Sequence, residues 1–125
     1  MSRTITLDTG ALIALERRSQ RMTDVLARAR LREEVMIVSQ VVLAEWWRGR
    51  SDWRERILAS LVVEPLTDAR AKLAGEAAAR VAGATVIDAI VMASAASRGD
   101  VVFTSDVDDL EALRAFFPAA RVLSV

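Results

Sequence analysis

The 125-residue sequence contains no cysteine and no histidine. Disulfide bonds, thiolate metal sites, imidazole ligands and imidazole catalysis are therefore excluded. We expect a reducing, cytoplasmic environment, since a chain without cysteine needs no oxidising compartment. The sequence has no run of 18 apolar residues, which a transmembrane helix would need. The N-terminal residues also lack the apolar segment of a signal peptide, so we expect no membrane contact.

An excess of positive charge is also missing, although nucleic-acid-binding proteins commonly have one. The 17 basic and 17 acidic residues give a formal net charge of zero. Residues 1–60 carry 11 arginines against 8 acidic residues, whereas residues 61–125 carry 6 basic against 9 acidic residues. The only lysine is Lys72. This preference for arginine suits bidentate phosphate contacts, and a GC-rich genome explains it equally well. Binding of nucleic acid therefore requires a local basic patch.

Short apolar runs alternate with segments of helical periodicity along the chain. The runs that predict strands are TITL (4–7), EVMIVS (34–39), VVEPL (62–66), VVFTS (101–105) and RVLSV (121–125). The segments that predict helices cover residues 10–18, 22–34, 40–50, 52–61, 67–83, 85–99 and 106–117. Apolar strands alternating with helices are typical of a parallel sheet covered on both faces. We therefore predict a single α/β domain over residues 1–125, three-layered, with a central parallel sheet of about five strands flanked by helices.

Four acidic residues lie in apolar surroundings that most other acids of the chain lack. Asp8 and Asp106 follow two predicted strands, and parallel sheets bind ligands at the carboxyl ends of their strands. Glu45 in VVLAEWW and Asp88 in TVIDAIVMASAA lie within apolar helical patterns, where a buried carboxylate is costly unless it is paired or metal-bound. The alternative for Asp8 and Asp106 is a purely structural role as helix N-caps.

The apolar surroundings of all four acids are explained if the four side chains converge in one crevice. Carboxylates so near to one another repel unless a cation lies between them. A site with only oxygen ligands favours Mg²⁺ or Mn²⁺. Such an ion activates water and polarises a phosphodiester. Asp109, three residues after Asp106, either joins the site or belongs to a capping arrangement. Thr9, Thr104 and Ser105 flank the strand-end acids and either orient substrate or are ordinary turn residues.

The segment WWRGRSDWRER (46–56) is the candidate for substrate contact. It alternates tryptophan with arginine, and aromatic stacking combined with arginine–phosphate contacts holds single-stranded RNA. Arg48 and Arg50 are therefore candidate RNA-binding residues. The tryptophans are alternatively anchors in the core or in a partner groove, which is the interpretation that we favour for Trp46 and Trp47.

Four motifs resemble, in order and spacing, the acidic motifs of the PIN domain, in particular those of VapC-type toxin ribonucleases: LDTGALIAL, VVLAEWWRG, VIDAIVMASA and VVFTSDVDDL. The resemblance covers almost the whole chain from Thr4 onwards. It implies Mg²⁺- or Mn²⁺-dependent cleavage of RNA, homodimerisation, and inhibition by a cognate VapB-like antitoxin. Asp109 matches a more variable additional acid, and Thr104 or Ser105 a common hydroxyl position. The resemblance implies a catalytic and metal-binding quartet formed by Asp8, Glu45, Asp88 and Asp106.

The sequence also has features of other functional classes. Asp8-Thr9-Gly10 spells the active-site triplet of aspartic proteases, but helical periodicity over more than half of the chain argues against their all-β scaffold. An aspartyl phosphatase needs a second Asp at the position of Gly10, and a phospho-acceptor domain needs a lysine after a late strand. The serious alternative is a non-catalytic, dimeric binding module whose acids hold a structural ion.

Overall fold

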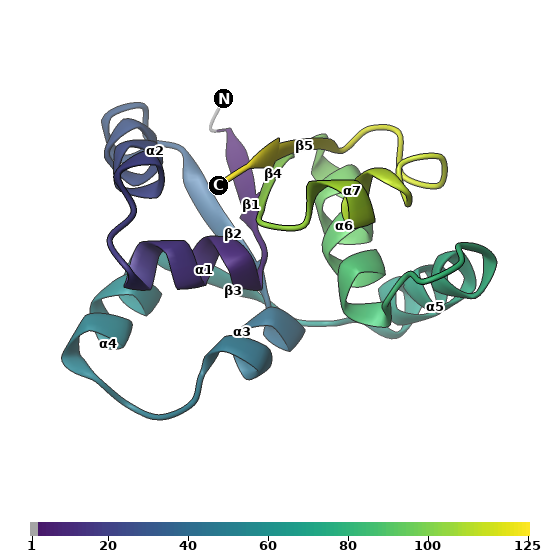
Figure 1. Ribbon diagram of the computed structural model, residues 1–125, viewed down its shortest axis with the longest axis horizontal. Helices are drawn as coiled ribbons and strands as arrows, with labels where there is room; N and C mark the ends of the chain where they lie inside the picture. The colour runs from purple at the N-terminus through teal and green to yellow at the C-terminus, as the bar shows by residue number, and fades with distance from the viewer. Residues whose placement is uncertain (1–2) are drawn as a thin grey trace.

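The computed structural model describes residues 3–125, which form one five-stranded sheet with helices around it (Figure 1). Within these residues the strands are β1 (Thr4–Leu7), β2 (Val35–Ser39), β3 (Leu61–Glu64), β4 (Val101–Thr104) and β5 (Arg121–Ser124). The helices in the same range are α1 (Thr9–Glu16), α2 (Gln20–Leu31), α3 (Gln40–Trp46), α4 (Asp52–Ala59), α5 (Asp68–Arg80), α6 (Val86–Arg98) and α7 (Val107–Glu111).

The strands lie in the order β3-β2-β1-β4-β5, and all four pairings are parallel. Helices α1 and α2 pack on one face of the sheet, and α6 and α7 on the other, with α5 packed outside α6 (Figure 1). The predicted three-layer α/β fold is confirmed. The central strand is β1, which has β2 and β4 as neighbours.

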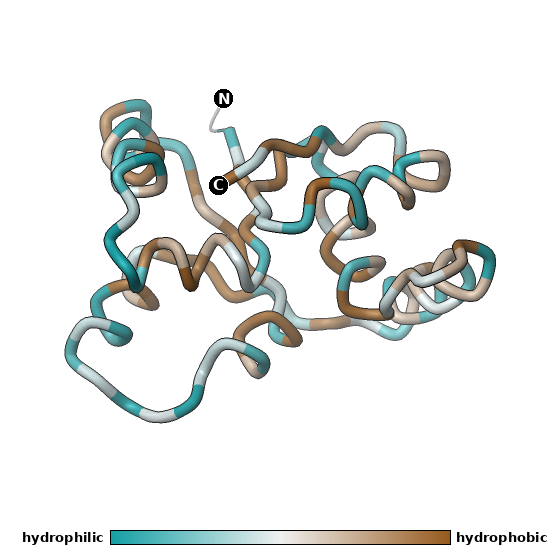
Figure 2. The backbone as a smooth tube through the Cα atoms, viewed as in Figure 1, coloured by the Kyte–Doolittle hydropathy of each residue, from teal (hydrophilic) through white to brown (hydrophobic). Residues whose placement is uncertain are grey.

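The central strands β2, β1 and β4 are mainly apolar because helices cover this part of the sheet on both faces, whereas β5 at the edge is mostly exposed. Leu7, Val38 and Val102, from the three central strands, are fully buried, as are Leu12 of α1 and Met92 of α6. Figure 2 shows hydrophobic residues along the strands and along α6, whereas the loop between α3 and α4 is neutral to hydrophilic. No helix within residues 3–125 is long and apolar enough to cross a membrane.

Short polar residues begin most of the helices. A hydroxyl at the N-cap accepts a backbone N–H from the first turn and so satisfies a donor that the helix leaves unpaired. Gly99 ends α6 with φ 70°, a left-handed conformation that glycine adopts without strain. The residues that act as such N-caps are Ser19, Ser39, Ser51, Thr67 and Thr85.

Two helices end earlier than the sequence predicts. α3 ends at Trp46 instead of near Gly49, because Trp47 adopts an extended conformation. α7 ends at Glu111 instead of Phe117, and the chain continues in turns with i→i−3 hydrogen bonds, such as that from Phe117 N–H to the Arg114 carbonyl. These tighter turns still bury Leu113 and Phe117, which explains why the apolar spacing resembled that of a longer helix.

Candidate active site

Asp8 and Asp106 lie at the carboxyl end of the sheet, where β1 and β4 adjoin. From β1 the chain adds β2 and β3 on one side of the sheet and then β4 and β5 on the other, so the strand order reverses between β1 and β4. Parallel sheets bind ligands at such a point. The backbone N–H of Asp8 donates to the carbonyl oxygen of Phe103 at 3.3 Å, which fixes Asp8 beside the end of β4.

The side chain of Thr104 connects these two acids. Its hydroxyl donates to Oδ2 of Asp8 and accepts the backbone N–H of Asp106 at 2.9 Å. Oδ1 of Asp8 accepts the N–H of Ala11 at 3.0 Å, so Asp8 is also the N-cap of α1. Because Thr104 is fully buried, the prediction that it contacts substrate is wrong, and its hydroxyl positions Asp8 instead.

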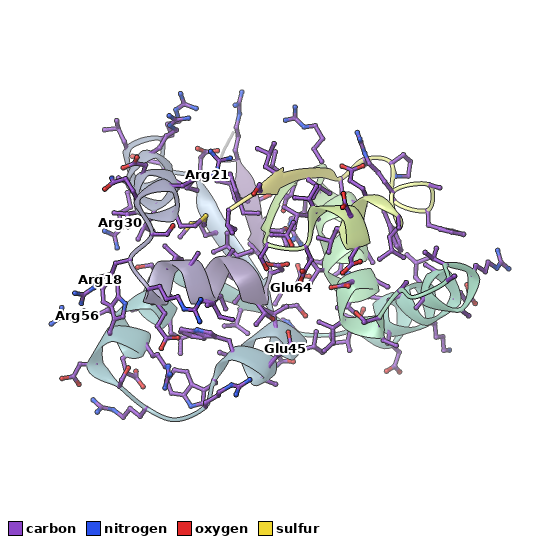
Figure 3. The ribbon with its side chains drawn as sticks, in the orientation of Figure 1. Arg18, Arg21, Arg30, Glu45, Arg56 and Glu64 are labelled. Atoms are coloured by element: carbon purple, nitrogen blue, oxygen red, sulfur yellow. The ribbon has the colours of Figure 1, made fainter. Side chains whose placement is uncertain are left out.

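Glu45 lies in the last turn of α3, below the beginning of α1 in Figure 3. Its Oε1 accepts the hydroxyl of Thr9, the first residue of α1, and this contact places Glu45 next to Asp8. The expectation of a carboxylate buried in an apolar helix is wrong for Glu45, which is exposed. The reason is that α3 buries Val42 and Trp46, one turn apart, and leaves Glu45 at the edge of that face.

Asp88 lies in α6, as its apolar helical pattern predicted, but it is the third residue and belongs to the first turn. Thr85 is the N-cap, and its hydroxyl accepts the N–H of Asp88 at 3.1 Å. The residue is half-buried. A carboxylate in the first turn of a helix is stabilised by the helix dipole, so this position carries negative charge more readily than a mid-helix position.

Asp106 and Asp109 are exposed at the beginning of α7. Asp106 occupies the N-cap position, but its side chain makes no capping hydrogen bond. The interpretation of Asp106 as purely a cap therefore lacks the contact that defines a cap. Asp109 follows in the first turn, and Asp108, beside it, is exposed as well.

Burial raises the pKa of Asp8 to about 6 from an ordinary value of 3.8. Within this pKa shift, the hydrogen bonds from Thr104 and Ala11 oppose the effect of burial, and the negative charges of Asp106 and Asp88 add to it. The apolar packing of a strand end, which keeps water from the carboxylate, is thus the main cause of the shift.

Asp88 shares this electrostatic environment. Burial raises its pKa, and contact with the Thr85 hydroxyl opposes the shift. Repulsion from three other carboxylates adds to the rise, and these belong to Asp109, Asp106 and Glu45. The acids selected from the sequence therefore act on one another electrostatically, although they come from four different segments.

The donors in this crevice suit a hard divalent cation, since they are carboxylate and hydroxyl oxygens with no nitrogen or sulfur ligand. In the described part of the chain, none of the five carboxylates forms an ion pair. Across residues 3–125, however, no three of them form a ready-made metal site. Uncompensated like charges repel, and the hydroxyls of Thr9 and Thr104 hold two of the acids in separate hydrogen bonds.

Gly10 provides the space in which α1 meets the loop after β4. A Cβ atom at this position would lie 2.1 Å from Oγ, 2.8 Å from Cβ and 2.9 Å from the backbone N of Ser105. We expect Gly10→Ala to push the Ser105–Asp106 segment away from Asp8. The expected loss in the free energy of unfolding is about 1–3 kcal/mol, as for other overpacked positions. Urea unfolding measures this loss.

Gly75→Ala is the matched control for this substitution. Gly75 lies in α5, and a Cβ atom there would meet nothing within 4 Å. Alanine is favoured over glycine inside a helix by about 1 kcal/mol, so this variant should be as stable as the wild type or more stable. Equal stability of the Gly10→Ala and Gly75→Ala proteins would contradict the steric role of Gly10.

The candidate substrate contacts differ in their accessibility. Ser105, Arg48 and Arg50 are exposed, and Arg50 faces Asp52 at 3.3 Å and Glu55 at 3.9 Å on the same segment. Those pairs lie in solvent and are weak, so they leave the Arg50 guanidinium able to exchange partners.

The tryptophans of the 46–56 segment are structural anchors. Trp46 is buried, and its Nε1 donates to Oε1 of Glu16 at 3.0 Å, while Nε1 of Trp53 donates to the carbonyl oxygen of Glu16 at 3.0 Å. Arg54 binds Oε2 of Glu16 through two nitrogens, at 2.8 and 3.1 Å. Trp47 packs against the core, edge-on to Trp46. The preferred interpretation of Trp46 and Trp47 as anchors is confirmed, and Glu16 is the hydrogen-bond partner of Trp46 and Trp53.

A second group of buried charges was not recognised from the sequence. Asp100 is 3% exposed and accepts hydrogen bonds from Thr4, Thr6 and Arg98. Arg98 also binds Glu64, at the end of β3. These carboxylates have a cationic partner, unlike those at the ends of β1 and β4. The contrast separates a structural ion-pair network from the candidate active site.

A protein-family model described as PIN domain matches residues 5–115. The chain belongs to the PIN-domain family. A comparison with curated protein sequences finds no match. The four acids discussed above lie within the matched residues.

Several solved structures have folds similar to that of this PIN domain. VapBC2 from Rickettsia felis, bound to a DNA fragment from its promoter, has a TM-score of 0.73 and 15% sequence identity over 98% of each chain. FitAB bound to the IR36 DNA fragment has a TM-score of 0.68 and 20% identity over 96% of this chain and 94% of the other. PAE2754 from Pyrobaculum aerophilum has a TM-score of 0.61 and 24% identity over 98% and 92% of the two chains. At these identities the likeness establishes the fold alone.

Proposed function

We propose that this PIN-domain protein is a divalent-metal-dependent endoribonuclease and the toxin of a toxin–antitoxin pair. One observation carries the nuclease assignment. Several carboxylates meet at the carboxyl ends of β1 and β4, the pKa values of Asp8 and Asp88 are raised there, and none of these acids has a cationic partner among the described residues. Proteins of this family are generally nucleases.

In this proposal the acids hold Mg²⁺ or Mn²⁺, with Asp109 as an additional ligand. A bound ion of this kind lowers the pKa of water and stabilises the negative charge that develops on a phosphodiester. The metal-binding and catalytic acids are Asp8, Glu45, Asp88 and Asp106.

The neighbouring residues keep these acids in position. Thr104 and the N–H of Ala11 fix the two oxygens of Asp8, and Thr9 holds Glu45. The exposed hydroxyl of Ser105 and the exposed guanidinium groups of Arg48 and Arg50 bind the phosphates of the RNA. Arginine suits this role because its planar group contacts two phosphate oxygens at once.

The toxin assignment rests on the folds that this chain resembles. VapBC2 and FitAB are complexes in which a PIN-like chain accompanies a partner on DNA. By analogy, this protein acts in the cytoplasm as a homodimer, and a VapB-like antitoxin inhibits it. The analogy is one of fold, so the partner has to be tested separately from the chemistry.

Metal removal tests the nuclease assignment. The purified protein, freed of any bound partner, should cleave single-stranded RNA in Mg²⁺ or Mn²⁺ and should stop cleaving after EDTA treatment. Cleavage should return when the ion is added in excess, because the protein contributes ligands and not the Lewis acid. Gel analysis of a 5′-labelled RNA measures the rate.

Two results would argue against the proposal. Cleavage that persists in EDTA would indicate a metal-independent contaminant or a different mechanism. Binding of Mg²⁺ without any cleavage of RNA would favour the alternative, a dimeric binding module with a structural ion.

A further inference from the structure

A groove separates α2 from the sheet face formed by β1, β4 and β5. Its volume is about 820 Å³. Side chains of alternate strand residues project from the same face, and the register places Ile5 beside Val101 and Phe103 beside Leu123 along the floor. Leu123 is 45% exposed. The sheet is thus open at its β5 edge, whereas Ile5 and Phe103, farther from that edge, are each 8% exposed.

Four exposed arginines surround this apolar floor. Arg3 precedes β1, Arg28 and Arg32 come from the end of α2, and Arg121 begins β5. Among the described residues, none of these four guanidinium groups makes an ion pair or a side-chain hydrogen bond. Their charges are therefore available to a ligand.

The acids that line the groove do not neutralise these arginines. Asp100 is buried and already accepts a hydrogen bond from Arg98, which also lines the groove. Glu34 is the remaining acid of the lining, against four unpaired arginines. The local charge is thus strongly positive in a chain whose net charge is zero.

The groove is distinct from the candidate active site. It extends to Arg3 and Gly99, at the amino ends of β1 and β4, whereas Asp8 and Asp106 lie beyond the carboxyl ends of the same strands. At its other end Arg21 joins α2 to β5, because its Nε donates to the carbonyl oxygen of Ser124 at 2.7 Å (Figure 3). This bond links α2 and β5 at this end of the groove.

We infer that this groove binds an extended acidic segment of a protein partner. Carboxylates of the segment meet the four arginines, and its alternate apolar side chains lie on the floor. RNA fits less well, because unspecific binding of single strands uses exposed aromatic stacking surfaces. The only aromatic side chain of the lining is Phe103, which is 8% exposed and has the Arg21 guanidinium 6.0 Å from its ring centroid.

Fluorescence anisotropy with a labelled eight-residue peptide of alternating glutamate and leucine tests this inference at low ionic strength. We expect the wild-type protein to bind the peptide, and the double variant Arg28→Ala/Arg121→Ala to bind it at least tenfold more weakly. The affinity of the wild-type protein should fall as salt is added. The matched control is Arg17→Ala/Arg80→Ala, which removes two exposed arginines outside the groove and should leave affinity unchanged.

Methyl chemical shifts give the location independently of affinity. The signals of Val25, Val101 and Leu123, which line the groove, should move on addition of the peptide. A peptide with lysine in place of glutamate should not bind, and one with serine in place of leucine should bind more weakly. No binding of the glutamate–leucine peptide, or equal affinity for the groove variant and its control, would overturn the inference.

Two further measurements keep this site separate from RNA cleavage. The Arg28→Ala/Arg121→Ala protein should cleave RNA at the wild-type rate, because the groove lies away from the acids. If this variant instead no longer binds an eight-nucleotide single-stranded RNA but still binds the peptide, the groove is an RNA-binding site and the inference is wrong. A protein that cleaves no RNA but binds the peptide in the groove refutes only the proposed function.

Discussion

Replacing Asp88 with asparagine is expected to reduce the rate of RNA cleavage roughly a thousandfold or more. The substitution keeps the size of the side chain and removes one negative charge from the crevice. A metal ligand contributes several kcal/mol of charge stabilisation in the transition state, and each 1.36 kcal/mol is about tenfold in rate. The fold should survive, since the N–H of Asp88 still donates to Thr85 and the side chain makes no ion pair that stabilises α6.

Asp108→Asn is the matched control for this change. Asp108 is exposed, lies one residue before Asp109, and undergoes the same loss of charge outside the electrostatically coupled group. Its cleavage rate should stay within about twofold of the wild type, as expected for a solvated charge. Rates of Mg²⁺-dependent cleavage under single-turnover conditions compare the two variants. If the Asp88→Asn variant cleaves RNA at the wild-type rate, the proposal that these carboxylates form the catalytic site is wrong.

The same pair of variants tests the toxin role in cells. Expression of the wild-type chain alone should arrest growth, and expression of Asp88→Asn should not, while Asp108→Asn should behave as the wild type does. Mapping RNA ends after brief induction identifies the RNA that is cut. Unimpaired growth with the wild-type chain, together with cleavage in vitro, would leave the nuclease chemistry in place and reject the toxin role.

Asp8→Asn is expected to make the cation-free protein more stable at neutral pH. In the folded state Asp8 has a pKa of about 6, against 3.8 for an unperturbed aspartate. Between these values the folded protein holds a proton that the unfolded chain has released, so the free energy of unfolding decreases as pH rises from about 4 to about 6. Above pH 6 the full cost of the ionised Asp8 is present, on the order of 3 kcal/mol. Asparagine does not ionise and avoids this cost.

Urea unfolding in EDTA at pH 4.5 and pH 7.5 measures this effect as the difference between wild type and variant. The difference should favour Asp8→Asn at pH 7.5 and should be about a third as large at pH 4.5. Added Mg²⁺ should stabilise the wild type and leave the variant nearly unchanged, since a ligand of the folded state stabilises by mass action. A variant that is less stable at pH 7.5 would mean that the hydrogen bonds from Thr104 and Ala11 outweigh the burial of the charge.

Asp100→Asn provides the opposite case. Asp100 is buried as deeply as Asp8, but it accepts hydrogen bonds from Arg98, Thr4 and Thr6. Loss of a hydrogen bond between charged groups costs about 1.5–3 kcal/mol, so this variant should be less stable than the wild type at pH 7.5. If Asp8→Asn raises the free energy of unfolding and Asp100→Asn lowers it, the charge of Asp8 serves a ligand and the charge of Asp100 stabilises the fold.

The periodicity of the sequence predicted the strands well because each strand is a short, mainly apolar run between helical segments, and the central strands are covered on both faces. It also selected Asp8 and Asp106, since an acid directly after such a run stands at a strand end. The length of α7 was overestimated, because the buried Leu113 and Phe117 fit both a helix and a series of tighter turns. Asp88 was expected to be more deeply buried than it is, because the apolar residues around it concealed its position in the first turn after the N-cap Thr85.

What the sequence by itself determined is the order of the elements, the parallel sheet and the four acidic motifs of a PIN domain. The elements and the sheet follow from side-chain polarity within a few residues of each position, and the motifs follow from the resemblance to the PIN family. The tertiary structure alone decided that Thr104 contacts Asp8, that Arg98 contacts Glu64 and Asp100, and that Ser105 leaves no room for a side chain at Gly10. Thr104 and Asp8 are 96 residues apart. Whether a charge is buried, paired or left for a ligand depends on such distant partners, and local periodicity contains no information about them.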